Sequence, residues 1–335
     1  MQNGECKMQG TSTAFHLHFS FKEVAMSAST GSAVIEKTAA KTAAGPGTFP
    51  QRILGKTGEL VPMLGLGSAP GGMGLPDEEA IALIHKAIDL GVTYIDTATG
   101  YGRAQAQLGE VMQARRKEVF LVTKTNTAEG PKALEILEQN LKLLQTDQVD
   151  LVFVHSLGGM DVEKVLAKDG SLAALREAQR RGWTRYVGFT AHNAPWKAAK
   201  VLREAEVDAI MLAMNIGDRH TYNFEEEVLP LAVKQNAGVA AMKVYGGAQG
   251  MKYETPKPSA MGAHGPHDHG LALRYALGLP GVTVAVIGMF SEEELRRNIA
   301  GVRDYKPLTE AEGRGATALG QELSKAWGEH FGAAK

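Results

Sequence analysis

The stretch Val92–Tyr101, VTYIDTATGY, places an acidic residue at the end of a short strand and a tyrosine on the loop beyond it. Val92, Tyr94 and Ile95 favour β structure, and Asp96 ends this run. Small and turn-forming residues then lead to Tyr101. The stretch therefore predicts a carboxylate and a phenol at the same end of one strand.

Two later apolar runs end in the same way. Residues 119–123, VFLVT, lead to Lys124, and residues 151–154, LVFV, lead to His155. An unpaired ammonium is costly away from water, so a lysine at the end of a buried strand needs a partner. Adjacent parallel strands would place Lys124 beside Asp96, which makes these two residues a predicted ion pair.

The pattern of strands and helices alternates regularly along most of the chain. Strands are expected at 63–67, 92–96, 119–123, 151–154, 185–189, 209–213, 239–242 and 282–287. Helices are expected at 77–90, 104–114, 131–144, 171–181, 195–205, 224–235, 270–277 and 291–300, with a last one at 309–327. Asp96, Lys124 and His155 are spaced by about 30 residues, the length of one β/α unit. Eight such units predict an α/β fold, a (β/α)₈ TIM barrel with an extra C-terminal helix.

An open, doubly wound sheet is the alternative fold. It is less favoured because no G-x-G-x-x-G sequence follows a strand early in the chain. Functional side chains of a barrel gather at the carboxyl ends of its strands, which is where the residues above are expected.

Composition narrows the class of protein. The 335 residues carry 36 basic and 37 acidic side chains, and 44% are apolar. There is no basic stripe for nucleic acid, and no run of about 20 apolar residues for a membrane helix. The single cysteine, Cys6, excludes an internal disulfide and fits a reducing, cytoplasmic location.

The first 48 residues differ in composition from the rest. Ser, Thr, Ala, Gly and Lys dominate, and no amphipathic period is evident. We expect a disordered tail over 1–48 and a barrel domain over 49–335. A start at Met26 is an alternative, and a targeting peptide is disfavoured by the lack of an apolar segment and by the acidic residues of the tail.

The motifs YIDTATGYG (94–102), FLVTK (120–124) and DLVFVHS (150–156) are similar to those of the aldo-keto reductase superfamily. Asp96, Tyr101, Lys124 and His155 resemble its catalytic tetrad, and the resemblance extends in colinear order over roughly residues 51–300. It implies that a hairpin at 52–62 closes the bottom of the barrel.

The resemblance also implies an NAD(P)H-dependent reductase of a small aldehyde or ketone. Tyr101 would donate the proton, although a free tyrosine has a pKa of about 10. Lys124 would lower that pKa, Asp96 would hold Lys124 in place, and His155 would hydrogen-bond the substrate carbonyl. Taken singly, these residues would be a structural ion pair, a loop aromatic and a core histidine. A non-catalytic nicotinamide-binding regulatory subunit on the same fold is the alternative.

Cofactor contacts follow from the same resemblance and from local chemistry. Lys243 and the glycines after it offer a cation and exposed backbone amides for a pyrophosphate. Residues 288–291 begin a helix whose backbone amides could donate hydrogen bonds to a phosphate. The expected NADP or NAD contacts are Gly67, Ser68, Thr190, Asn193, Met211, Lys243, Gly246, Gly247, Gly288, Met289, Glu294 and Asn298. Glu294 stands where the resembling family commonly has a basic residue that binds the 2′-phosphate of NADP. We therefore expect the site to accept NAD as well.

The segment 246–269 is too long for an ordinary connection, and we expect it to be a lid over the substrate. Its residues His264, His267 and His269 could instead form a metal site, which would suit a metal-dependent barrel hydrolase. Short His-rich tracts are weak signals, so no metal is predicted.

Overall fold

The computed structural model of the chain describes residues 49–265 and 269–335. The tail expected over 1–48 and the residue His267 lie outside the described residues. All four residues of the predicted tetrad and all predicted cofactor contacts lie within them.

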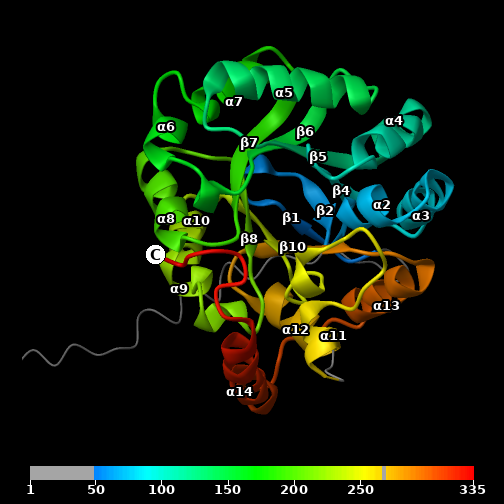
Figure 1. Ribbon diagram of the computed structural model, residues 1–335, viewed down its shortest axis with the longest axis vertical. Coiled ribbons are helices and arrows are strands. Elements are labelled where there is room, and N and C mark those ends of the chain that lie inside the picture. The colour runs from blue at the N-terminus through cyan, green and yellow to red at the C-terminus, as the bar shows by residue number, and fades with distance from the viewer. Residues whose placement is uncertain (1–48, 266–268) are drawn as a thin grey trace, which may run out of the picture. The chain divides into compact units, whose positions relative to one another are not determined.

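The parallel barrel predicted from the sequence is confirmed (Figure 1). Eight strands close in the order β10-β3-β4-β5-β6-β7-β8-β9, and every neighbouring pair is parallel. The strands are β3 Leu64–Gly67, β4 Tyr94–Asp96, β5 Phe120–Thr125, β6 Val149–Val154, β7 Thr184–Ala191, β8 Ala209–Ala213, β9 Gly238–Met242 and β10 Val282–Gly288.

Helices surround the barrel (Figure 1). The α-helices are α2 Ala69–Gly74, α3 Asp77–Asp89, α4 Ala104–Arg115, α5 Gly130–Leu143, α6 Val162–Leu166, α7 Ser171–Arg180, α8 Pro195–Glu204, α9 Phe224–Glu227, α10 Leu229–Lys234, α11 Ala260–His264, α12 His269–Gly278, α13 Glu292–Arg303 and α14 Glu310–Trp327. Single 3₁₀ turns occur at η2 Gly55–Thr57, η3 Arg116–Glu118, η4 Leu157–Gly159, η5 Asp218–His220 and η6 Gln249–Met251.

Two differences from the expected elements have local causes. The helix expected over 224–235 is interrupted at Val228, because Pro230 lacks an amide hydrogen and its ring crowds the preceding turn. The glycine-rich helix α2 was not expected, because its residues are poor helix formers. A Cβ added to Gly72 would lie 2.1 Å from the Tyr101 carbonyl oxygen, so only glycine fits at this position.

The predicted hairpin lies at the amino-terminal ends of the strands. β1 (Gln51–Ile53) pairs antiparallel with β2 (Leu60–Pro62). The Arg52 guanidinium donates 2.7 Å hydrogen bonds to the carbonyls of Leu277 and Val282. Leu54 is fully buried and packs with the apolar residues inside the barrel. The hairpin therefore closes this end of the barrel.

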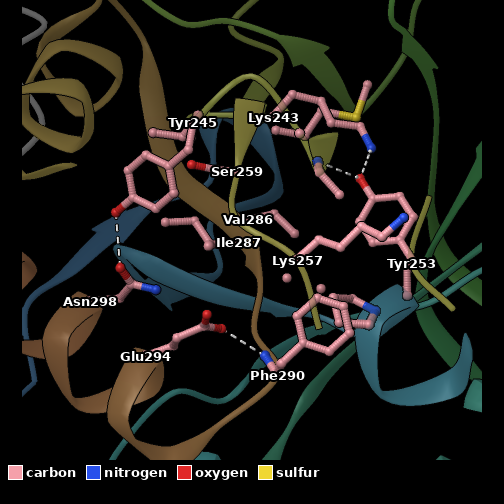
Figure 2. A pocket seen from close by; sticks show the side chains of 18 of the residues that line it. Lys243, Tyr245, Tyr253, Lys257, Ser259, Val286, Ile287, Phe290, Glu294 and Asn298 are labelled. Carbon is pink, nitrogen blue, oxygen red and sulfur yellow. Dashed lines mark hydrogen bonds between the residues drawn. The ribbon is translucent and has the colours of Figure 1, made fainter. Parts of the chain in front are cut away.

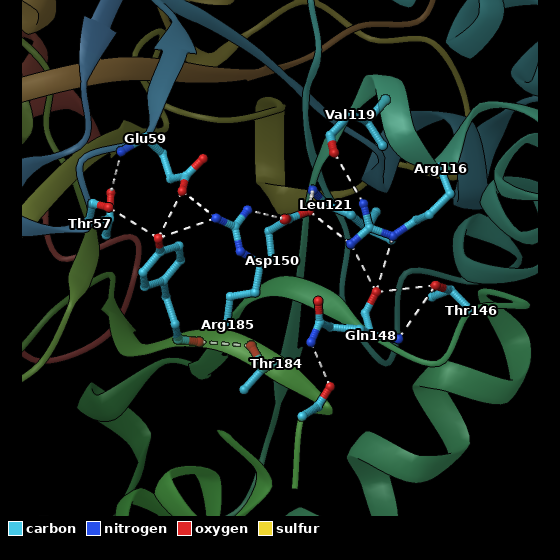
Figure 3. Close-up of polar contacts among 12 residues, drawn as sticks. Thr57, Glu59, Arg116, Val119, Leu121, Thr146, Gln148, Asp150, Thr184 and Arg185 are labelled. Atoms are coloured by element: carbon cyan, nitrogen blue, oxygen red, sulfur yellow. Dashed lines mark hydrogen bonds and ion pairs between the residues drawn. The ribbon is translucent and has the colours of Figure 1, made fainter. Parts of the chain in front are cut away.

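A network of charged side chains joins the hairpin to the same ends of the strands (Figure 3). Asp150 accepts a 2.8 Å hydrogen bond from the Leu121 amide and lies 2.9 Å from both Arg116 and Arg185. Arg185 also pairs with Glu59 of the hairpin. Asp150 is buried, so its charge depends on these partners. We call this set of residues the lower network.

Candidate active site

Asp96 and Lys124 form the ion pair predicted from the sequence. Asp96 is the last residue of β4, and Lys124 is on the neighbouring strand β5. Their side chains are 5% and 1% exposed, and Lys124 Nζ lies 2.6 Å from Asp96 Oδ2. The ammonium also donates a 2.8 Å hydrogen bond to the Thr97 carbonyl. Burial raises the pKa of Asp96 and lowers the pKa of Lys124, and the attraction between the two charges opposes both shifts.

Tyr101 and His155 stand beside this pair. Lys124 Nζ lies 4.9 Å from the centre of the Tyr101 ring, and the rings of Tyr101 and His155 are 6.0 Å apart, edge to face. The loop between Asp96 and Tyr101 contains Gly100, whose φ of 92° is a backbone conformation that glycine adopts readily and other residues rarely adopt. The four residues predicted as a tetrad are thus brought together at the carboxyl ends of adjacent strands.

The Tyr101 phenol is held in its protonated form. Burial raises the pKa of Tyr101 and Asp96 raises it further, while the charge of Lys243 acts in the opposite direction. This differs from the sequence-based expectation of a pKa lowered by Lys124. Burial is the largest effect on the phenol, and the negative charge of Asp96, the partner of Lys124, acts in the same direction.

His155 is neutral over the physiological range. Burial lowers the pKa of its imidazole to about 3, and the nearby ammonium groups of Lys124 and Lys243 act in the same direction. Its backbone amide donates a 2.9 Å hydrogen bond to the Thr125 carbonyl, which fixes it at the end of β6. A neutral imidazole has one N–H donor, so His155 can donate one hydrogen bond to an oxygen in the site.

A cavity of about 290 Å³ is lined by Asp96 and Tyr101 and by residues at the amino end of α13. Figure 2 shows Glu294 and Asn298 of α13 on one side of it and Lys243 and Tyr253 on the other. The ends of β3, β8, β9 and β10 form its floor. Seven of the predicted cofactor contacts line it, namely Gly67, Met211, Lys243, Gly247, Gly288, Glu294 and Asn298.

The remaining predicted contacts do not line this cavity. Met289 and Ser68 are buried, and Gly246 packs against the Trp327 ring. The Thr190 hydroxyl accepts a 2.8 Å hydrogen bond from the Ser156 amide. The Asn193 side chain donates a 3.0 Å hydrogen bond to the carbonyl of Ala333, in the C-terminal segment.

Several lining residues were missed by the sequence analysis. Tyr253 accepts a 2.7 Å hydrogen bond from Lys243 Nζ, and Tyr245 donates a 2.9 Å hydrogen bond to Asn298 Oδ1 (Figure 2). Lys257 and Arg297 also line the cavity. The available signals were membership of the long segment 246–269 for Tyr253 and Lys257, and closeness in sequence to a predicted contact for Tyr245 and Arg297.

The segment 246–264, which we call the strap, lies along this cavity. Its two ends meet in an antiparallel bridge between Ala248 and Ser259. A Cβ added to Gly74 of α2 would lie 2.3 Å from the Tyr253 carbonyl oxygen, so the strap reaches the opposite side of the cavity. The strap thus contacts the predicted cofactor residues. In the described part of the chain, no three metal-binding side chains come together and no helix is long and apolar enough to cross a membrane.

A closed parallel barrel with an acid, a lysine, a tyrosine and a histidine at the carboxyl ends of its strands agrees with the class of protein indicated by the sequence motifs. The chain belongs to the Aldo/keto reductase family, whose model matches residues 63–268, more than half of the chain. It is an NAD(P)-dependent oxidoreductase.

Individual relatives agree with this assignment. The chain is 27% identical over 301 residues to the uncharacterized oxidoreductase YqkF of Bacillus subtilis, covering 78% of this chain and 94% of the relative. It is 24% identical over 292 residues to L-galactose dehydrogenase of Arabidopsis thaliana, covering 77% and 89%. The structure is similar to the thermostable aldo-keto reductase Tm1743, with a TM-score of 0.63, 26% identity, and coverage of 82% and 99%.

Proposed function

We propose that this chain reduces an aldehyde or ketone to an alcohol, with Tyr101 as the proton donor. The observation that carries the proposal is the position of the protonated phenol. It lies beside both the buried Lys124–Asp96 pair and the neutral His155, at one end of a cavity lined by predicted nucleotide contacts.

Each side chain has a separate role in this reaction. A bound reduced nicotinamide supplies the hydride that adds to the carbonyl carbon. Tyr101 gives its hydroxyl proton to the carbonyl oxygen as negative charge develops there. Lys124 stabilises the resulting phenolate, and His155 donates a hydrogen bond that orients the carbonyl. Asp96 keeps Lys124 charged and in place. The products are an alcohol, the oxidised nucleotide and a phenolate that regains its proton from water.

The cavity suits a dinucleotide. Lys243 has a phenol as its partner, and no carboxylate among the described residues pairs with it. Gly288 is exposed at the end of β10, so a ligand can approach its backbone closely. Lys243 and Gly247 would hold the diphosphate, and Asn298 the adenine end.

Glu294 bears on the choice between the two nucleotides. Its carboxylate accepts a 2.7 Å hydrogen bond from the Phe290 amide at the amino end of α13, a position where a phosphate would otherwise be favoured (Figure 2). A negative charge there disfavours a 2′-phosphate. We therefore infer that the site accepts NAD as well as NADP.

The substrate belongs to the class of small polar carbonyl compounds. Full-length relatives include L-galactose dehydrogenase and pyridoxal 4-dehydrogenase, and shorter matches include the methylglyoxal reductases DkgA and YeaE. Their substrates share a carbonyl or hydroxyl carbon flanked by polar groups.

The deciding experiment is a nucleotide titration followed by a panel of carbonyl compounds. Binding of NAD(H) or NADP(H) together with nucleotide-dependent reduction of at least one small aldehyde is the expected result. Nucleotide binding without turnover of any member of the panel, in either direction of the reaction, would favour the non-catalytic alternative.

A further inference from the structure

A buried polar cluster lies behind the tetrad, on the side facing α5. Asn140 of α5 is 1% exposed. Its amide donates a 2.9 Å hydrogen bond to the Lys124 carbonyl and a 3.2 Å one to the Thr123 hydroxyl. The Thr99 hydroxyl lies 2.8 Å from Asn140 Oδ1 and 3.3 Å from the same Lys124 carbonyl. Three elements therefore meet at the backbone of Lys124.

Asn140 is the one residue with a polar side chain among the buried residues of α5. The other buried residues of α5 are glycine, alanine, isoleucine and leucine, which pack against the sheet. A buried amide is costly unless its groups are hydrogen-bonded, and an apolar residue would be the simpler solution at such a position. Here both ends of the amide are used, and every partner belongs either to β5 or to the loop that carries Tyr101.

Other contacts hold this loop on either side of Tyr101, at Thr97, whose carbonyl accepts a hydrogen bond from Lys124 Nζ, and at Arg103, which pairs with Asp77. Thr99 is followed by Gly100, Tyr101 and Gly102, and the two glycines have φ angles of 92° and 54°. Glycines in this region are conformationally permissive, so the sequence alone does not fix the position of the ring. The Tyr101 amide donates only a long, 3.3 Å hydrogen bond to the Ala98 carbonyl. In the buried part of this turn, Thr99 is the side chain that ties it to α5 and to the backbone of Lys124.

We propose that Thr99 and Asn140 form a clamp that positions the Tyr101 phenol relative to the Lys124 ammonium. The inference rests on the proposed function, because it assigns the clamp a role in proton donation. Neither residue touches the reacting atoms, so both are positioning residues. Small displacements of a reacting group reduce rates strongly, which makes such a clamp consequential.

Thr99→Val tests the clamp, because it removes the hydroxyl and keeps the volume. We expect kcat to fall about tenfold or more, with nucleotide affinity unchanged and activity recovered in Thr99→Ser. Thr283→Val is the matched control. Thr283 is 2% exposed, and its hydroxyl lies 3.2 Å from the Ile53 carbonyl at the other end of the barrel. This control should lower the free energy of unfolding and leave kcat unchanged.

A second measurement needs no turnover. The Tyr101 phenol can be titrated as the ultraviolet difference between each protein and its Tyr101→Phe counterpart. Loosening the loop exposes the ring to water, so Thr99→Val should titrate at lower pH than the parent, whereas Thr283→Val should not.

The two measurements separate the two ideas. If Thr99→Val matches Thr283→Val in both kcat and phenol titration, the clamp is wrong and the reductase assignment stands. If no carbonyl is reduced by the parent while Thr99→Val still shifts the titration, the clamp stands and the proposed function fails.

Discussion

Lys243 donates a 2.7 Å hydrogen bond to the hydroxyl of Tyr253, and its ammonium lies 5.0 Å from the centre of the same ring. Lys243 directly follows β9 and Tyr253 belongs to the strap, so this contact fastens the strap to the wall of the cavity. The cation proposed to hold the diphosphate is therefore half-buried and already oriented.

Lys243→Met should weaken nucleotide binding. A hydrogen bond to a charged group is worth about 1.5–3 kcal/mol, which corresponds to a rise in Kd of roughly tenfold to a hundredfold. Lys252→Met, an exposed lysine of the same strap, is the control and should bind as the parent does. Fluorescence titration with NADH and NADPH measures both, and equal Kd values for the two variants would exclude Lys243 from the site.

Tyr101→Phe should remove most turnover while nucleotide affinity stays near the parent value, because the phenol acts on the substrate oxygen. A loss of about 10²- to 10⁴-fold in kcat is the usual scale for a general acid. Steady-state and single-turnover kinetics measure it. A variant with nearly normal kcat would require a different proton donor.

Lys124→Met should lower both activity and stability. It leaves the Asp96 carboxylate buried without its partner, which costs about 3–5 kcal/mol of unfolding free energy. The double variant Asp96→Asn/Lys124→Met removes the stranded charge as well. Urea unfolding should show that the double variant recovers part of the stability, and kinetics should show that activity stays lost. Recovery of activity would contradict the role of Lys124.

The stability of the barrel should fall with acid in a defined window. The folded pKa of His155 is about 3, below its ordinary value of 6.5, so the unfolded chain takes up a proton that the folded chain does not. The contribution of His155 is complete above pH 6.5 and is lost as the pH falls from 6.5 towards 3. The slope is up to about 1.4 kcal/mol per pH unit.

His155→Asn should flatten this slope in urea unfolding measured across the window. Burial also lowers the pKa of His192, whose ring is 6.1 Å from that of His155. A second flattening is therefore expected in the double variant with His192→Asn. An unchanged slope in both variants would show that the two imidazoles titrate freely in the folded chain.

Glu294→Arg should shift nucleotide preference towards NADP, because it replaces the negative charge at the amino end of α13 with a partner for the 2′-phosphate. A change of about tenfold in the ratio of kcat/KM values corresponds to 1.4 kcal/mol. Glu293→Arg makes the same change in charge at an exposed neighbouring position and is the control. If both variants shift the ratio equally, the effect is one of net charge.

The fold and the meeting of Asp96, Tyr101, Lys124 and His155 could be predicted because each depends on short-range patterns. Apolar strands ending in Asp96, Lys124 and His155 specify both the barrel and the face on which these residues meet. A lid was expected over 246–269, but the contacts of Tyr253 could not be predicted, because they depend on how the segment folds back to Lys243 and across to Gly74, which is distant in sequence. The predicted lowering of the Tyr101 pKa was wrong for a related reason. Burial, which raises this pKa, is a property of the folded chain.

The lower network has a consequence for how this chain can vary. Asp150, Arg116 and Arg185 bind together the strand ends that lie opposite the tetrad. Substitutions that reshape the catalytic loops leave these bonds untouched. Substitutions in the loops can therefore change the substrate range without weakening the contacts that hold the barrel together at its other end.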